Sequence, residues 1–107
     1  MHVEELLSRY ADSHDLERGT LVWFNCAVSR WSKHLGRLPV SEDFSDTVFN
    51  AWLTAELKGE RLSRQTLSSY RRALLMLWRW GWRKGYVAEG PRDPKPVKAP
   101  LPIPRGL

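Results

Sequence analysis

The distribution of proline does most to limit the folds open to this chain. Six of the seven prolines lie between Pro91 and Pro104, and the other is Pro39. Proline lacks a backbone N–H and clashes with the preceding helical turn, so the C-terminal segment cannot continue a helix or form a central strand. We therefore expect one folded domain over residues 1–90 and an extended proline-rich linker over residues 91–107.

Two apolar stripes at helical spacing predict two helices before Pro39. The first runs from Val3 to about Ser13 and the second from about Thr20 to Leu35, with Gly36 as its stop. Within each stripe the apolar residues share one face of a helix. They are Val3, Leu6, Leu7 and Tyr10 in the first helix, and Leu21, Phe24, Val28, Trp31 and Leu35 in the second.

Two further helices are predicted after Pro39. Ser41 or Ser45 can cap the third, which Gly59 would end, and Ser63 caps a fourth that runs to about Lys84. The apolar positions of the third helix are Phe44, Val48, Phe49, Trp52, Leu53 and Leu57. In the fourth helix Leu67, Tyr70, Leu74, Leu77, Trp78 and Gly81 share one side, while Gln65, Arg72, Met76, Arg79 and Arg83 lie opposite. The fold class we expect is all-α, a compact bundle of four helices with an extended tail.

Composition gives little support to a membrane protein or an enzyme. The longest apolar run, residues 73–78, has six residues, whereas a membrane span needs about 20. The single cysteine, Cys26, cannot form an internal disulfide and suits a reducing cytoplasm. It also has no histidine one helical turn away, and His2, His14 and His34 share no helical face or metal-ligand spacing. We expect no catalysis by this chain alone, no metal, no cofactor and a cytoplasmic location.

The positive charge is concentrated toward the C-terminal end. The chain carries a net charge of +5, with a calculated isoelectric point of about 9.8. Residues 1–37 hold five acids and five bases, and residues 38–60 hold five acids and one base. Residues 61–107 hold eleven bases and two acids. An acidic partner would therefore meet the C-terminal part of the chain first. The alternative interpretation is that these basic residues only form a solvated helix surface.

The start of the fourth helix carries features of a phosphate-binding site. Ser63, Arg64, Gln65 and Thr66 offer free backbone N–H groups, hydroxyls and a cation at the positive end of a helix dipole. Ser63 and Thr66 are candidates for capping and for phosphate binding alike. Arginine can donate two hydrogen bonds to a phosphate or a guanine edge, and a helix fits the major groove of DNA.

The six tryptophans divide into two groups by position. Trp31, Trp52 and Trp78 lie on apolar stripes and are expected in the core. Trp23, Trp80 and Trp82 lie off the centre of their stripes, so one or more is expected to be partly exposed. An exposed tryptophan can pack on a neighbouring domain, which we favour, or stack on a base.

Several stretches together have the pattern of one known domain. They are Leu62-Ser63-Arg64-Gln65-Thr66-Leu67, Tyr70-Arg71-Arg72-Ala73-Leu74, Leu77-Trp78-Arg79-Trp80-Gly81 and Lys84-Gly85-Tyr86-Val87, with Thr20, Phe24 and Trp31 in the second helix and Phe49, Trp52 and Leu53 in the third. This order resembles the N-terminal core-binding domain of the tyrosine recombinases, the phage-integrase family. The resemblance covers roughly residues 3–91. The family often has Asn-Pro after the last helix, where this chain has Gly90-Pro91.

The resemblance implies a four-helix SAM-like fold that grips duplex DNA. In the family a separate C-terminal domain closes on the other side of the DNA and supplies the tyrosine nucleophile that cuts and rejoins strands. We expect that domain to follow the linker, so Tyr10, Tyr70 and Tyr86 are not interpreted as the nucleophile, and Tyr70 is expected in the core. The partners implied are double-stranded DNA, the catalytic domain of the same protein and further copies on DNA, with no membrane.

The residues expected to face DNA come from two helices. From the fourth helix they are Ser63, Arg64, Gln65, Thr66, Ser69, Arg72, Arg79 and Arg83; from the second they are Thr20, Asn25, Arg30 and Lys33. Two other functions stay open. A helical protein-interaction module would bind through exposed tryptophans, almost independently of salt. A stand-alone helix-turn-helix regulator would dimerise and bind DNA tightly without a further domain.

Overall fold

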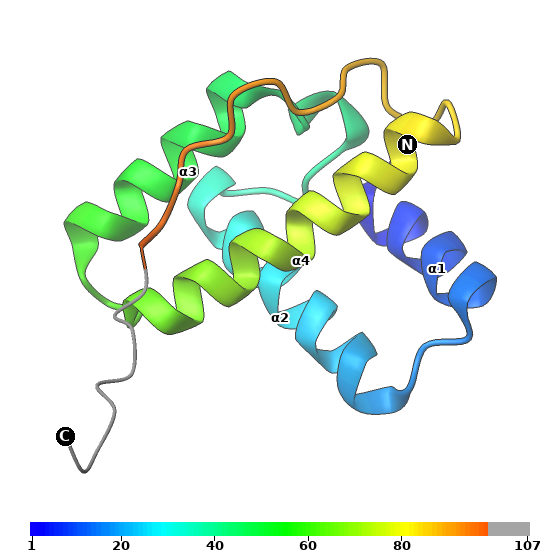
Figure 1. Ribbon diagram of the computed structural model, residues 1–107, viewed down its shortest axis with the longest axis horizontal. Coiled ribbons are helices and arrows are strands. Elements are labelled where there is room, and N and C mark those ends of the chain that lie inside the picture. Colours follow the sequence, from blue (N-terminus) through cyan, green and yellow to red (C-terminus); the bar gives the residue numbers. More distant parts are fainter. Residues whose placement is uncertain (99–107) are drawn as a thin grey trace, which may run out of the picture.

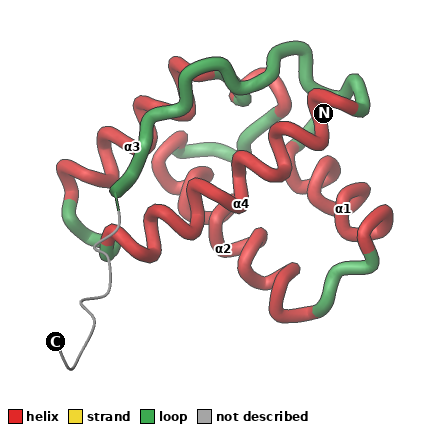
Figure 2. Tube along the Cα trace, in the orientation of Figure 1, coloured by secondary structure: helices red, strands yellow, loops and turns green. Residues whose placement is uncertain are grey.

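Residues 1–98 form four helices, so the predicted all-α class is confirmed. The computed structural model describes residues 1–98, and residues 99–107 of the predicted linker lie outside the described part. The helices are α1 (Val3–His14), α2 (Arg18–Leu35), α3 (Asp46–Gly59) and α4 (Arg64–Arg83), with a single 3-10 turn, η1, at Ser41–Asp43 (Figure 1). Residues 1–98 contain no β-strand, only one isolated bridge between His2 and Val40 (Figure 2).

The ends of the helices follow the predicted capping residues with one exception. Ser45 caps α3, because its Oγ accepts a hydrogen bond from the Val48 N–H at 3.2 Å. Gly36 ends α2 at a φ of +72°. The exception is the C-cap of α3. Gly59 is the last residue of this helix, as predicted, but Glu60 takes the left-handed conformation at a φ of +53°, and its N–H donates to the Glu56 carbonyl.

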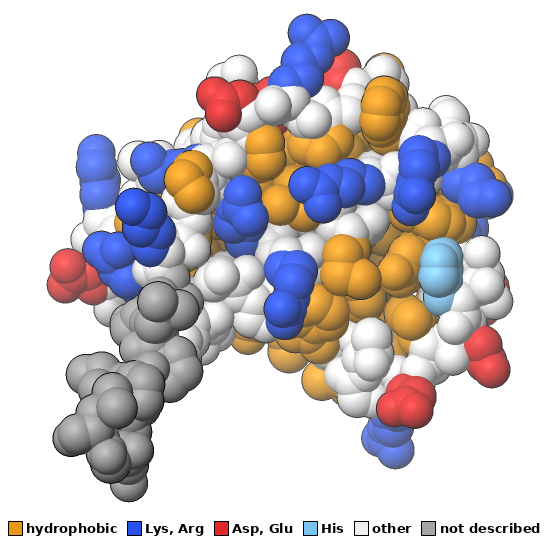
Figure 3. Space-filling view, in the orientation of Figure 1, with side chains coloured by type: hydrophobic (Ala, Val, Ile, Leu, Met, Phe, Trp, Pro, Cys, Tyr) orange, Lys and Arg blue, Asp and Glu red, His pale blue; other side chains and the backbone are white. Residues whose placement is uncertain are grey.

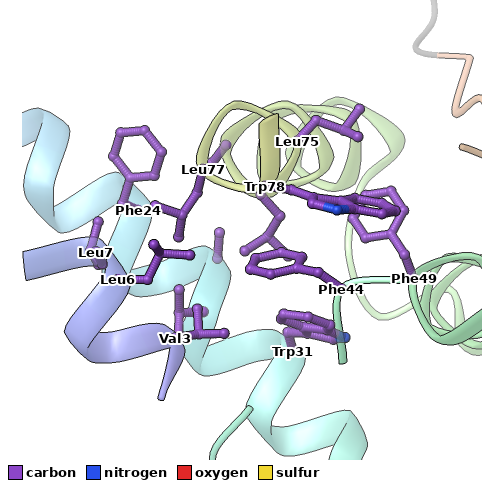
Figure 4. Packing of buried hydrophobic residues seen from close by; sticks show 14 of the residues in the cluster. Val3, Leu6, Leu7, Phe24, Trp31, Phe44, Phe49, Leu75, Leu77 and Trp78 are labelled. Atoms are coloured by element: carbon purple, nitrogen blue, oxygen red, sulfur yellow. The ribbon is translucent and has the colours of Figure 1, made fainter. Parts of the chain in front are cut away.

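The core is built around aromatic rings from α2, the loop before α3, α3 and α4. The three tryptophans predicted to be interior, Trp31, Trp52 and Trp78, are fully buried. Phe44 lies between two of them, with ring centroids 5.0 Å from Trp31 and 5.6 Å from Trp78 (Figure 4). Phe44 was predicted within the third helix, but it belongs to the loop that precedes α3. This loop residue therefore joins α2 to α4 through the aromatic core.

α4 crosses the middle of the molecule and packs against all three other helices (Figure 1). Its buried arc is wider than the predicted stripe, since Ala73, Leu75 and Trp80 are buried as well. Tyr70, which was predicted to lie in the core, is only half-buried. A Cβ added at Gly81 would lie 2.9 Å from a Val87 methyl carbon and 3.0 Å from one of Leu6, so glycine allows the close packing here.

The chain folds back after α4 as an extended segment, residues 86–98, which we call the C-terminal strap (Figures 1 and 2). The Asp46 carboxylate accepts hydrogen bonds from two strap N–H groups at 3.2–3.3 Å. The Asn50 side chain donates to the Asp93 carbonyl at 3.0 Å and accepts from the Lys95 N–H at 2.7 Å. Residues 91–98 are therefore held against α3 by hydrogen bonds, which the proline-rich composition does not predict.

Within residues 1–98, no helix is both long enough and apolar enough to cross a bilayer.

Candidate nucleic-acid interface

The side of α4 turned away from the core forms a basic, shallow surface. We call it the outer face of α4 and define it by Gln65, Ser69, Arg72, Met76, Arg79 and Arg83. A depression of about 360 Å³ lies on it, lined by Gln65, Ser68, Ser69, Arg71, Arg72, Leu75, Met76 and Arg79. In the space-filling view of this side, Lys and Arg side chains cross the middle of the surface and most acidic side chains lie near its edges (Figure 3). Four predicted DNA-facing residues therefore meet in one depression.

The arginines of this outer face have no carboxylate partner within residues 1–98. Arg72, Arg79 and Arg83 form no salt bridge there, whereas the arginines of three other sites are paired with acids. The pairs are Arg9 with Glu5, Arg30 with Glu56 and Arg37 with Asp43. No salt bridge within residues 1–98 therefore offsets the positive charge of these arginines, which leaves it available to attract an anion.

Trp23 of α2 reaches the edge of the outer face and contacts two of its residues. Its indole N–H donates to Ser69 Oγ at 2.7 Å. The Arg72 guanidinium carbon lies 5.5 Å from the centre of the Trp23 ring, within the range of a cation–π contact. Sequence reasoning gave Trp23 only a possible docking role. The available signal was its position, next to the core residue Phe24 and therefore at the flank of α2.

Arg71 forms the other edge of the depression and joins it to the C-terminal strap. Its Nε–H donates to the Lys95 carbonyl at 2.6 Å, and a second guanidinium N–H donates to the Pro94 carbonyl at 3.4 Å. Burial, and next the nearby charge of Arg79, lower the pKa of Arg71, which stays protonated as arginine does in proteins. The sequence gave no indication of this role, because the partners are backbone carbonyls more than 20 residues away.

The hydroxyls at the start of α4 are engaged in the helix cap. Ser63 Oγ accepts from the Thr66 N–H at 3.1 Å and donates to Thr66 Oγ1 at 2.9 Å. Arg64 is exposed and lies beside a second hollow that also includes Glu56 and Glu60. The hydroxyls of Ser63 and Thr66 thus stabilise the helix cap, and Arg64 has two acidic side chains as neighbours. Of the residues predicted at this end, Gln65 alone lines the outer-face depression.

Three of the four predicted residues of α2 lie around a separate hollow. Asn25, Arg30 and Lys33 line it together with Val22, Cys26, Ser29, Leu62 and Tyr70. Arg30 is partly committed, because its Nε–H donates to Glu56 at 2.6 Å and both side chains are less than one-fifth exposed. Thr20 is half-buried and lies outside both hollows. α2 therefore presents Asn25 and Lys33 to solvent at a second place.

The off-centre tryptophans differ in exposure. Trp80 is buried, Trp23 is half-buried and Trp82 is 50% exposed, so the prediction that at least one is partly exposed is confirmed. A Cβ added at Gly90 would lie 2.7 Å from the Trp82 ring, so the strap backbone covers part of that indole.

Residues 1–98 contain no group of three potential metal-ligating side chains.

No family model, curated protein or solved structure matches this chain.

Proposed function

We propose that this chain is a duplex-DNA-binding domain of the core-binding type found in tyrosine recombinases, with a SAM-like arrangement of its four helices. The observation that carries the proposal is the outer face of α4, where three arginines lack any carboxylate partner within residues 1–98. A depression on that face also holds the polar side chains of Gln65 and Ser69. The resemblance of the sequence to the core-binding domain adds the recombinase context, and the single cysteine suits a cytoplasmic location.

In this proposal α4 binds mainly the phosphate backbone. Arg72 and Arg79 both line the outer-face depression, so an anion bound there would be attracted by two positive charges. Arginine donates up to two hydrogen bonds to one phosphate, and each phosphate neutralised releases bound counterions. The domain would grip and position DNA, while a separate catalytic domain breaks and rejoins the strands. Self-association on DNA belongs to the same proposal.

A second candidate, a protein-interaction module, is favoured by one observation. Trp82 is 50% exposed and Met76 is 39% exposed, and both lie on α4. Exposed tryptophan is enriched at protein interfaces. Binding through these side chains would depend little on salt concentration, which separates this candidate from DNA binding.

The experiment that tests the proposal is a salt series of binding to a generic labelled duplex, measured by fluorescence anisotropy. We expect the logarithm of the association constant to fall linearly with the logarithm of the salt concentration, with a slope magnitude of several units. Replacing both Arg72 and Arg79 by alanine should reduce that magnitude by roughly two, since each phosphate contributes about 0.9.

A matched control removes the same charge elsewhere. Arg18 and Lys58 are exposed, make no salt bridge within residues 1–98, and lie on α2 and α3. The double variant Arg18→Ala/Lys58→Ala should keep nearly the wild-type slope. Equal losses in the two double variants would mean that only net charge matters. Absence of binding by the wild type at low salt would refute DNA binding.

A further inference from the structure

Trp23, Ser69 and Arg72 form a small connected cluster on the edge of the outer face of α4. Ser69 and Arg72 are three residues apart and therefore neighbours on the helix surface. Both line the same depression. Trp23 comes from α2 and touches both of them, through a 2.7 Å hydrogen bond to Ser69 Oγ and a 5.5 Å contact with the Arg72 guanidinium.

The direction of the hydrogen bond leaves one group of this cluster available to a ligand. The indole N–H of Trp23 can only donate, so Ser69 Oγ must be the acceptor. The Ser69 hydroxyl proton has no acceptor within residues 1–98. A hydroxyl that already accepts one hydrogen bond is polarised and donates more strongly. Ser69 therefore presents a free O–H donor whose position is fixed by Trp23.

The contact with Trp23 also restricts Arg72. An exposed arginine loses considerable rotamer freedom when it binds a ligand, and that cost lowers affinity. The Trp23 ring holds the Arg72 guanidinium near Ser69 before any ligand arrives. Arg79 has no such ring contact within residues 1–98, although it lines the same depression. The two arginines therefore differ in how far they are preorganised.

We propose that Ser69 and Arg72 form a binding site for one backbone phosphate of DNA, with Trp23 as its positioning residue. The Ser69 hydroxyl and the Arg72 guanidinium would donate to the same phosphate group. This inference rests on the proposed function, and it adds a specific phosphate contact and a residue of α2 that holds it.

The test is a pair of double-mutant cycles read by duplex binding at fixed salt. Trp23→Leu removes both the N–H donor and the aromatic ring. In the wild-type background it should weaken binding by about twofold to fivefold, the range of an exposed cation–π contact. Combined with Arg72→Ala, the same substitution should weaken binding much less. Combined with Arg79→Ala, it should again have its full effect.

A second variant and an independent readout guard against a purely structural effect. Trp23→Phe retains a ring but loses the N–H, so it should keep most of the coupling to Arg72 and lose the coupling to Ser69→Ala. The side-chain protons of Arg72 should show an upfield ring-current shift by NMR in the free protein, and Trp23→Leu should abolish it. Thermal unfolding of every variant provides the correction for stability.

Two results separate the failure of this site from the failure of DNA binding. If the wild type binds duplex but Trp23→Leu acts equally in the Arg72→Ala and Arg79→Ala backgrounds, the phosphate site is wrong and DNA binding stands. If the wild type does not bind duplex, the proposed function fails and the ligand assigned to this site fails with it.

Discussion

α4 presents two different surfaces, and the adjacent Arg71 and Arg72 lie one on each. Arg71 turns toward the C-terminal strap and donates hydrogen bonds to the carbonyls of Lys95 and Pro94. Arg72 turns toward the outer face, is exposed, lies against the Trp23 ring, and makes no hydrogen bond or salt bridge within residues 1–98. Successive residues of a helix differ by about 100° in direction, so neighbours can serve different surfaces.

The comparison shows that arginine content alone does not define a binding face. Arg30 and Arg37 are ion-paired and Arg71 holds a backbone segment, so all three stabilise the fold. Arg72 and Arg79 have no acidic partner within residues 1–98 and are available to an external anion. What distinguishes the proposed binding face is that its unpaired arginines, Arg72 and Arg79, also line one depression.

The largest effect on stability is expected at Trp78, and its neighbour in sequence, Arg79, provides the comparison because it lies on the outer face of α4. Trp78 is fully buried between Phe44 and Phe49, whereas Arg79 is exposed. Trp78→Ala should lower the free energy of unfolding by about 3–5 kcal/mol. Arg79→Ala should change it by less than about 0.5 kcal/mol and should instead weaken duplex binding. Chemical denaturation followed by circular dichroism measures both. Similar losses of stability would erase the distinction between the faces.

Glycine substitutions test how closely the inner face of α4 packs. A Cβ at Gly81 would meet Val87 and Leu6 side chains at 2.9–3.0 Å, while a Cβ at Gly59 would meet no atom within 4 Å. Gly81→Ala should therefore destabilise the protein by about 1–3 kcal/mol. Gly59→Ala should be neutral or stabilising by up to about 1 kcal/mol, because alanine favours the helix. Thermal unfolding decides, and a neutral Gly81→Ala would mean that α1 and the strap yield easily.

The ion pair between Arg37 and Asp43 should make the stability of the protein depend on pH, because the Asp43 carboxylate can be protonated. Arg37 donates to both carboxylate oxygens of Asp43 at 2.6–2.7 Å. These hydrogen bonds lower the pKa of Asp43; burial opposes the shift and the Val40 N–H adds to it. Because the folded pKa lies below the unfolded value of about 3.9, this stability is complete above that value and is lost as pH falls through the folded pKa.

The variant Asp43→Asn should be less stable than wild type at neutral pH by about 1–3 kcal/mol, the range for hydrogen bonds to charged groups. The difference should shrink as the pH falls below about 4. Urea denaturation at a series of pH values measures it. A difference that stays constant down to acid pH would show that the Asp43 carboxylate keeps its ordinary pKa.

The smallest effect expected separates Arg71 from Arg72 directly. The Lys95 amide donates to Asn50 Oδ1, so its hydrogen exchange reports whether the strap is docked. Arg71→Ala should increase that exchange rate by about tenfold, the equivalent of one or two lost hydrogen bonds. Asn50→Ala is the positive control, and Arg72→Ala should leave the rate unchanged. Equal acceleration by Arg71→Ala and Arg72→Ala would assign both arginines to the strap.

Local patterns were enough to predict the helices and most of the core. The caps at Ser45 and Ser63 and the burial of Trp31, Trp52 and Trp78 follow from spacing and side-chain type. The patterns failed where a partner is distant in sequence or belongs to the backbone. The strap docks through hydrogen bonds between its backbone N–H and carbonyl groups and the side chains of Asp46, Asn50 and Arg71. Backbone partners of this kind cannot be predicted from residue type. The Arg30–Glu56 pair joins residues 26 positions apart.

The residues along the outer face of α4 were predicted, but the neighbouring residues Trp23 and Arg71 were not. Its central residues are set by helical periodicity alone. Trp23 and Arg71 reach it from the flanks, and their positions depend on how α2 and the strap pack on α4. α3 ends at Gly59 as predicted, but its left-handed cap residue is Glu60 and not a glycine, which residue type alone does not predict.

DNA binding by the outer face of α4 can be tested by an NMR titration of the isotope-labelled protein with a short generic duplex. We expect the amide and arginine Nε–H signals of Ser69, Arg72, Met76 and Arg79 to shift in proportion to bound DNA, while those of Arg37 and Lys58 do not. Shifts confined to the surroundings of Trp82 and Val22, or no shift at low salt, would contradict it.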